Sequence, residues 1–219
     1  MIDKYIEKLR PYVLEYFKED STGHDIGHLE RTLNTALYLC EKEGGDKVIV
    51  GISAFMHDIH RIMQTEKGQF VSPKESLGVV KEILSNIDLT EKQKEEICYC
   101  IEHHENYNWN GNNVKNKNAL ILQDADNLDA IGAIGIGRTF VYGGANKLKM
   151  YDSSIPLNEK NNYVESEGNN ETTIHHFYHK LFKLGDYMNT KTARKIAKKR
   201  TKLMRKFTEE FLKEWNSKY

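Results

Sequence analysis

Apolar side chains recur with helical spacing along nearly the whole chain of 219 residues. Segment 24–43 is the clearest case, because its apolar stripe follows the helical repeat and stops at Gly44-Gly45. Alternating patterns typical of strands are scarce, and only three prolines interrupt the chain. The sequence therefore predicts an all-α fold, a bundle of helices.

The expected helices follow one another without an internal repeat or a convincing linker. Asp46 is placed to cap one of them, and Thr90 with Gln93 forms the capping box of another. The expected segments are 3–18, 24–43, 46–63, 73–84, 90–104, an apolar stretch at 119–140, 173–184 and 190–215. Segment 106–118 is rich in asparagine and predicts a loop, and 142–172 predicts a long surface excursion. We expect a single domain over residues 1–219, with its core motifs in about 20–140 and a C-terminal helical extension at 173–215.

The charges balance, with 32 basic and 32 acidic residues. A chain of zero formal charge gives no reason to expect a nucleic-acid or membrane partner. The basic run from Lys191 to Lys206 is interpreted as the solvated face of a helix rather than as a binding patch. No stretch approaches the roughly 18 apolar residues that a membrane span needs.

The three cysteines lie within apolar helical patterns. Cys98 and Cys100 lack the Cys-x-x-Cys spacing of zinc ribbons and redox motifs, and Cys40 stands alone. We interpret all three as buried thiols in a reducing compartment. The first ten residues include Asp3 and Glu7 and lack the apolar core of a signal peptide, so we expect a cytoplasmic protein.

Imidazoles and carboxylates gather in four short clusters, each next to apolar helical sequence. The clusters are His24-Asp25-Ile26-Gly27-His28, His57-Asp58 with His60, His103-His104-Glu105, and the acids Asp124, Asp126 and Asp129. Spacing of four residues on a helix places His24 and His28 on one face. Asp58 ends an apolar run, where burying its charge is costly unless a cation neutralises it. Mixed nitrogen and oxygen ligands suit Mn, Fe, Co, Ni or Zn and, less well, Mg, so the clusters together indicate a divalent metal site.

The ordered series His28, His57-Asp58, Asp126 resembles the H…HD…D signature of the HD-domain metal-dependent phosphohydrolases. Longer motifs resemble one bacterial subfamily: His-Asp-Ile-Gly-His-Leu-Glu-Arg-Thr at 24–32, Ile-Glu-His-His at 101–104 and Gln-Asp-Ala-Asp-Asn-Leu-Asp-Ala-Ile-Gly-Ala-Ile-Gly at 123–135. The resemblance covers about residues 15 to 215. It implies that the bundle is a single HD domain.

The resemblance also implies roles for individual residues. The metal ligands are His28, His57, Asp58 and Asp126, and the family's Ala-Asp-x-Leu pattern is what selects Asp126 over Asp124 and Asp129. Catalytic candidates are Asp58, His104, His24 and Asp25, and substrate-binding candidates are Arg31, Lys180, Lys183 and Arg138. Several HD nucleotidases carry a Glu shortly after the HD pair, whereas here Ile59-His60-Arg61-Ile62 follows. His60 or Asp25 could replace that acid, and the proton-transfer role stays open.

The function implied is hydrolysis of a phosphate ester or anhydride by metal-activated water. A small phosphorylated substrate is expected, in particular a nucleotide, which makes the chain a nucleotidase or a nucleoside triphosphate pyrophosphohydrolase. The Asn, Tyr and Trp side chains of loop 106–110 could contact a base. The alternatives are a cyclic-nucleotide or guanosine tetraphosphate hydrolase and a non-catalytic, metal-bearing ligand sensor. A homo-oligomer is compatible with the sequence.

Two rival interpretations explain less of the sequence. His24-Asp25-x-x-His28 is close to the HExxH helix of zinc proteases, but this interpretation leaves His57-Asp58 and Asp126 without a role. Gly135-Ile136-Gly137-Arg138 could suggest a dinucleotide loop, but a third glycine and a preceding strand are lacking. These glycines are better explained as allowing helices to approach closely.

Overall fold

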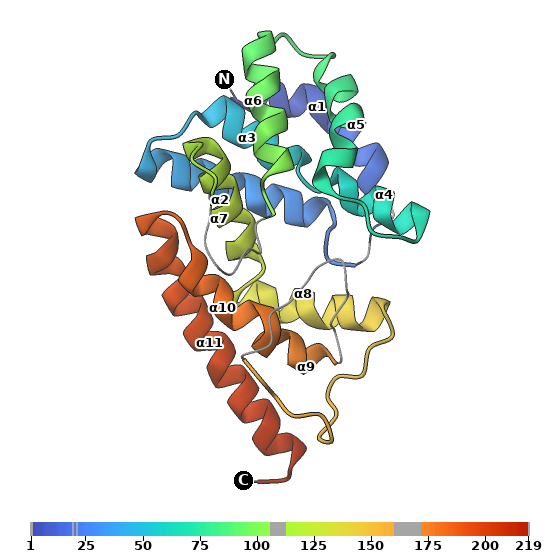
Figure 1. Ribbon diagram of the computed structural model, residues 1–219, viewed down its shortest axis with the longest axis vertical. Helices are drawn as coiled ribbons and strands as arrows, with labels where there is room; N and C mark the ends of the chain where they lie inside the picture. The colour runs from blue at the N-terminus through green and yellow to red at the C-terminus, as the bar shows by residue number, and fades with distance from the viewer. Residues whose placement is uncertain (1, 19, 21, 106–112, 160–171, 219) are drawn as a thin grey trace. The chain divides into compact units, whose positions relative to one another are not determined.

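A computed structural model describes residues 2–18, 20, 22–105, 113–159 and 172–218. The described residues form α-helices joined by turns, loops and short 3₁₀ and π segments, and they contain no strand (Figure 1). The all-α prediction is therefore confirmed. The chain forms two compact units, Met1–Asp126 and Asn127–Tyr219.

The first unit is built around a short apolar helix, α3 (Lys47–Met56), whose residues from Ile49 onward are all buried. It packs against α2, α6 and α1, so three neighbours cover its whole circumference and no polar face is needed. Asp46 caps α3 by accepting hydrogen bonds from the backbone N–H groups of Val48 and Ile49, as predicted. The other helices of this unit are α1 (Ile2–Phe17), α2 (Ile26–Glu43), α4 (Ile59–Lys67), η1 (Pro73–Ser76), α5 (Leu77–Leu84), α6 (Glu91–Glu102) and α7 (Lys117–Asp129), the last of which continues past Asp126.

The second unit centres on the long helix α11 (Lys191–Trp215), which packs against α8 (Gly132–Ala145) and α10 (Phe182–Leu184). Between them lies an aromatic cluster that joins rings from α8, the π segment and α11, namely Phe140, Phe177, Phe207 and Phe211. The remaining short elements are α9 (Thr173–His176), the π segment η3 (Phe177–Leu181) and η4 (Gly185–Tyr187).

Two predicted continuous segments are in fact divided. The segment at 46–63 forms α3 and α4, because the backbone at Asp58, with φ −94° and ψ 12°, leaves helical geometry and begins a new helix. The apolar stretch at 119–140 forms α7 and α8, with a break at Ala130 and Ile131. Periodicity alone missed both breaks, because a change in helix direction over one or two residues leaves the apolar spacing almost intact.

The predicted loops are described only in part. Lys117 and Asn118 belong to α7 rather than to the asparagine-rich loop, and residues 106–112, which include the proposed base contacts, lie outside the described residues. Of the predicted surface excursion at 142–172, Tyr142 to Ala145 complete α8, and residues 160–171 again lie outside the described part. No helix among the described residues is long and apolar enough to cross a membrane.

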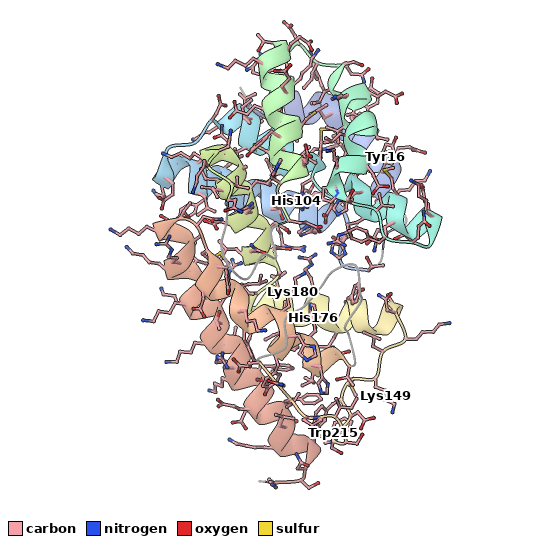
Figure 2. All side chains as sticks on the ribbon, in the orientation of Figure 1. Tyr16, His104, Lys149, His176, Lys180 and Trp215 are labelled. Atoms are coloured by element: carbon pink, nitrogen blue, oxygen red, sulfur yellow. The ribbon has the colours of Figure 1, made fainter. Side chains whose placement is uncertain are left out.

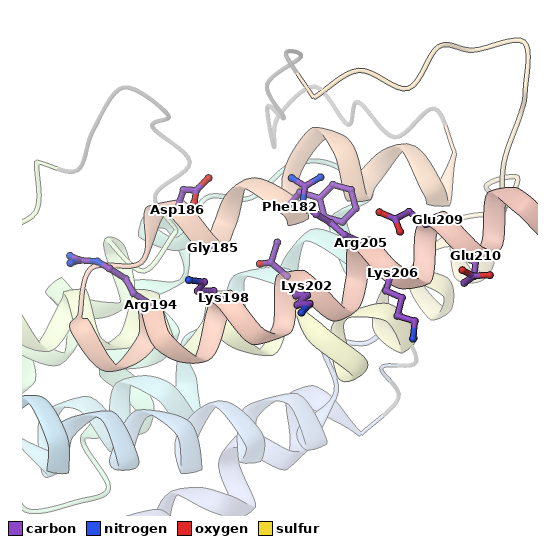
Figure 3. Close-up of a pocket in the computed structure, with 11 residues that line it drawn as sticks. Phe182, Gly185, Asp186, Arg194, Lys198, Lys202, Arg205, Lys206, Glu209 and Glu210 are labelled. Atoms are coloured by element: carbon purple, nitrogen blue, oxygen red, sulfur yellow. The ribbon is translucent and has the colours of Figure 1, made fainter.

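A surface groove of about 910 Å³ runs along α11 in the second unit (Figure 3). Its lining includes Arg194, Lys198, Lys202 and Lys206, and it contains none of the predicted site residues. Lys198, Lys202 and Lys206 are exposed on this face, and the interpretation of the basic run as a solvated helix surface stays a prediction.

The three cysteines are buried and unpaired, as predicted. Burial raises the pKa of the Cys40 thiol to about 11 and that of Cys100 to about 12, and it also raises the pKa of Cys98. All three side chains are therefore neutral thiols at physiological pH.

Substituting Gly135 with alanine should destabilise the second unit. Both Gly135 and Gly137 lie inside α8, which excludes the dinucleotide-loop interpretation. A Cβ atom at Gly135 would lie 2.3 Å from the carbonyl oxygen of Ala130, so backbone must move. We expect a loss of about 1–3 kcal/mol in the free energy of unfolding, measured by urea denaturation. Gly137→Ala is the matched control, because a Cβ there meets nothing within 4 Å and should stabilise the helix by up to about 1 kcal/mol. Equal effects of the two substitutions would contradict the packing argument.

Candidate metal centre

Three segments of the first unit bring the four predicted ligands together. His28 lies in the first turn of α2, whose N-cap is Asp25, and the Asp25 carboxylate accepts a 2.8 Å hydrogen bond from the His28 backbone N–H. His57 and Asp58 occupy the break between α3 and α4. Asp126 projects from α7. The break therefore has a consequence for the site, because it places both His57 and Asp58 at the junction of the two helices, as the C-cap of α3 and the N-cap of α4.

The donor atoms of these four residues lie within a few ångströms of one another. His28 Nε2 lies 3.2 Å from His57 Nε2, 3.2 Å from Asp58 Oδ2 and 3.5 Å from Asp126 Oδ1. His57 Nε2 lies 3.5 Å from Asp58 Oδ1 and 3.6 Å from Asp126 Oδ1. His28 and His57 are fully buried, and Asp58 is 3% exposed. Two imidazole nitrogens and two carboxylates thus surround one buried point.

Hydrogen bonds on the far side of the imidazoles direct Nε2 toward this point. His57 Nδ1 donates a 2.8 Å hydrogen bond to the carbonyl oxygen of Ala54, because a carbonyl can only accept. His28 Nδ1 lies 3.4 Å from the Thr32 hydroxyl. Such a partner on the second ring nitrogen is the usual support of a histidine that binds a metal through Nε2.

The electrostatics of the cluster favour a bound cation. Burial alone would lower the pKa of His57, yet the carboxylates of Asp58 and Asp126 raise it to about 9. Burial opposes ionisation of Asp58 and Asp126, but the neighbouring imidazoles hold the pKa of both carboxyl groups well below the usual range. The site thus stabilises positive charge between two carboxylates in a buried position.

The residues present fit a divalent metal ion. Asp58 Oδ2 and His104 Nε2 are buried and have no hydrogen-bond partner among the described residues. His28, His57 and Asp58 form one group of potential ligand atoms within 4.8 Å of one another, and His57 and Asp126 belong to a second with His104. Nitrogen and oxygen donors in this mixture suit Mn, Fe, Co, Ni or Zn better than Mg.

The other candidates of the first unit surround this cluster. His24 precedes α2 instead of lying on it, so the helical-face argument was wrong, although its ring centroid is still 5.9 Å from that of His28. Asp25 acts as a helix cap, and Arg31 is half-buried on the next turn. The catalytic roles of His24 and Asp25 and the phosphate contact of Arg31 stay predictions.

His104 rather than His103 faces the cluster. It follows the end of α6 instead of continuing the helix as predicted, and His104 Nε2 lies 3.7 Å from Asp58 Oδ1 (labelled in Figure 2). His104 Nδ1 donates a 2.6 Å hydrogen bond to the Ile101 carbonyl oxygen, and the side chain is 1% exposed. His103 instead stacks on Tyr99 at a centroid distance of 4.2 Å.

The other three substrate-binding candidates, Arg138, Lys180 and Lys183, belong to the second unit. Lys180 lies in the π segment and is 9% exposed, so it is not a solvated surface charge. Lys183 is half-buried, and burial lowers its pKa. Arg138 forms a 3.1 Å ion pair with Asp129, which accounts for that acid as a structural residue. Substrate binding by the three cations stays a prediction.

Sequence reasoning gave no role to Arg61 and Glu105. The two side chains form an ion pair about 10% exposed, and Glu105 Oε1 lies 3.4 Å from His60 Nε2. Burial alone would raise the pKa of Glu105, but Arg61 and His60 hold it well below its usual value. The sequence did contain one signal: the basic Arg61 directly follows His60, and the acidic Glu105 directly follows His104.

Comparison with known proteins identifies the family. The family model of the HD domain matches residues 25–131, which include all four predicted ligands. A solved HD-superfamily hydrolase from Bacillus thuringiensis is 33% identical in sequence, with 99% of each chain covered and a TM-score of 0.73. The chain belongs to the HD superfamily.

Two further solved structures are similar to this HD-domain chain. A protein from Lactobacillus plantarum is 31% identical, with 99% of each chain covered and a TM-score of 0.82. Bacillus subtilis YpgQ, solved in complex with ADP, is 27% identical over 95% of this chain and 96% of its own, with a TM-score of 0.65. The fold is that of the HD-superfamily hydrolases, and its His and Asp cluster could hold a metal ion.

The metal-free HD domain should lose stability as the pH rises from 6.5 to 9. His57 has a raised pKa in the folded state, so its stabilising contribution is complete below its unfolded pKa and is lost as the pH passes about 9. We expect a loss on the order of 3 kcal/mol, measured by urea denaturation in the presence of a chelator. The variant His57→Asn should show a much flatter profile, and an equally steep one would contradict this explanation.

Proposed function

We propose that this HD-domain chain is a metal-dependent phosphohydrolase that acts on a nucleotide. The proposal depends chiefly on the convergence of His28, His57, Asp58 and Asp126 on one buried point. A bound divalent ion would supply Lewis-acid polarisation of a phosphoryl oxygen and a water of lowered pKa.

The chain's own residues would hold and orient the reacting groups. The four ligands fix the ion, and the Ala54 carbonyl oxygen keeps the His57 ring in its orientation. Burial of His28, His57 and Asp58 strengthens the electrostatic interactions at the site, and the Asp126 side chain, 17% exposed, leaves the site open to solvent on its side. His104 Nε2, which lacks a hydrogen-bond partner, is available to contact a phosphoryl oxygen next to Asp58.

A nucleotide is the favoured substrate class because the related YpgQ has been solved with ADP. Within this class, the proposal covers removal of a single phosphate and removal of pyrophosphate from a triphosphate. Cyclic nucleotides and guanosine tetraphosphate remain the alternatives that an assay must separate.

A substrate screen tests the proposed function directly. Metal-depleted protein is supplied in turn with Mn²⁺, Mg²⁺, Co²⁺ and Ni²⁺, and each sample is incubated with nucleoside mono-, di- and triphosphates, cyclic nucleotides and guanosine tetraphosphate. Release of phosphate and of pyrophosphate is measured separately, which identifies the scissile bond. We expect turnover of at least one nucleotide that requires added metal. Tight metal and nucleotide binding without turnover of any compound would favour a ligand sensor instead.

A further inference from the structure

Four buried residues next to the metal centre form a second polar array outside the four-ligand set. They are His60 and Arg61 in the first turn of α4, and His104 and Glu105 directly after α6. His60 is 0% and His104 1% exposed, and the side chains of Arg61 and Glu105 are both 10% exposed. The array therefore joins two segments that are distant in sequence.

The Glu105 carboxylate is the centre of this array. It pairs with the Arg61 guanidinium, and its Oε1 lies 3.4 Å from His60 Nε2 and 4.0 Å from His104 Nε2. Both imidazoles are held from behind, because His104 Nδ1 donates to the Ile101 carbonyl oxygen and His60 Nδ1 donates to that of His57. The Nε2 atoms of both rings are thereby turned toward Glu105.

Through His104, the array reaches the metal centre. His104 Nε2 lies 3.7 Å from Asp58 Oδ1 on one side and 4.0 Å from Glu105 on the other. Its ring also contacts those of His57 and His60 edge-on, at centroid distances of 4.9 and 5.3 Å. His104 follows the end of α6, where its backbone N–H still donates a 3.4 Å hydrogen bond to the Ile101 carbonyl oxygen. The Arg61–Glu105 pair additionally ties this segment to α4.

We propose that Glu105, fixed by Arg61, is a positioning residue that holds His104 beside Asp58 for turnover. The proposal rests on the proposed phosphohydrolase function. A buried ion pair is a poor source of stability, so its effect should appear mainly in the geometry of His104.

Glu105 is less suited to being a metal ligand. The carboxylate oxygen that faces the two imidazoles is the one paired with the Arg61 guanidinium, and a cation there would be placed against a permanent positive charge. The metal affinity of a Glu105 variant therefore distinguishes a positioning residue from a metal ligand.

The test compares Glu105→Gln with the matched control Glu102→Gln. Glu102 ends α6 three residues earlier and pairs with Lys74 at 3.5 Å, outside the buried array. We expect Glu105→Gln to lower kcat for ATP with Mn²⁺ by about tenfold or more, with KM and Mn²⁺ affinity changed by no more than about twofold. Glu102→Gln should match the wild type in all three quantities.

A second readout does not depend on activity. In the Zn²⁺-loaded protein, two-bond ¹H–¹⁵N spectra report the orientation and tautomer of His104. We expect its ring signals to shift or broaden in Glu105→Gln and to stay unchanged in Glu102→Gln. If Glu105→Gln does not fold, Arg61→Gln/Glu105→Gln removes both charges together and should show the same kcat and spectral changes.

The outcomes separate the two proposals. Wild-type kcat in folded Glu105→Gln, or unchanged His104 signals, would overturn the positioning role and leave the phosphohydrolase function intact. A loss of Mn²⁺ affinity of about tenfold or more in Glu105→Gln would identify Glu105 as a metal ligand and would also overturn the positioning role. Absence of hydrolysis of every compound in the substrate screen by the wild type would instead remove the proposed function.

Discussion

Asp58→Ala is expected to abolish metal-dependent hydrolysis while leaving the helices intact. The substitution removes a carboxylate that lies within 3.5 Å of both His28 Nε2 and His57 Nε2. Because the loss of an outer contact to a metal ligand alone costs about 10–100-fold, removing a ligand should lower both Mn²⁺ affinity and turnover by more than about 100-fold. Isothermal titration of metal-depleted protein with Mn²⁺ measures the first, and phosphate release measures the second.

Asp88→Ala provides the control for this variant. Asp88 is an exposed aspartate of the first unit and does not belong to the His and Asp cluster, so both metal affinity and turnover should stay at wild-type values. Circular dichroism should show the same helical content in both variants. Full activity of Asp58→Ala after metal depletion and restoration would rule out the proposed centre.

Asp126→Asn should lower Mn²⁺ affinity about as much as Asp58→Ala does, whereas Asp124→Asn should leave it nearly unchanged. The two acids lie on the same helix two residues apart, but only Asp126 approaches His28 and His57 within 3.6 Å. Asparagine keeps the size of the side chain and removes the charge that balances the cation. We expect Mn²⁺ affinity to fall by more than about 100-fold in Asp126→Asn, measured by the same titration.

Asp124→Asn tests the assignment of the ligand on α7. Asp124 is fully buried, so its substitution should lower the melting temperature, yet Mn²⁺ should still bind with near wild-type affinity. The opposite result, with metal lost from Asp124→Asn and retained by Asp126→Asn, would transfer the ligand role to Asp124.

Local signals in the sequence were sufficient to predict much of the fold. Asp46 before α3 and Thr90 with Gln93 before α6 cap their helices as expected, because capping depends on residues only a few positions apart. The four predicted ligands were also chosen from the sequence, since their order along the chain resembles a known signature. The structure adds that the four donors share one buried point.

Contacts between distant segments could not be predicted. Arg61 and Glu105 are 44 residues apart, and although each directly follows a histidine of a motif, nothing in the sequence indicates that the two side chains pair with each other. The breaks at His57-Asp58 and after α6 were missed because apolar periodicity indicates which face of a helix a residue lies on. It does not indicate the residue at which the helix ends. These breaks are where His57, Asp58 and His104 reach the site.

The shielding of the three cysteines has a practical use in spectroscopy. The thiolate is the nucleophile that attacks a thiol-reactive probe, so burial and the raised pKa values of Cys40, Cys98 and Cys100 should make all three native sulfurs slow to react. A cysteine introduced at an exposed position, such as Lys198 on α11, should therefore accept a single spin label or fluorophore without replacement of any native residue. Pairs of such labels, one in each unit, would allow distances to be followed during metal and nucleotide titrations in the otherwise native chain.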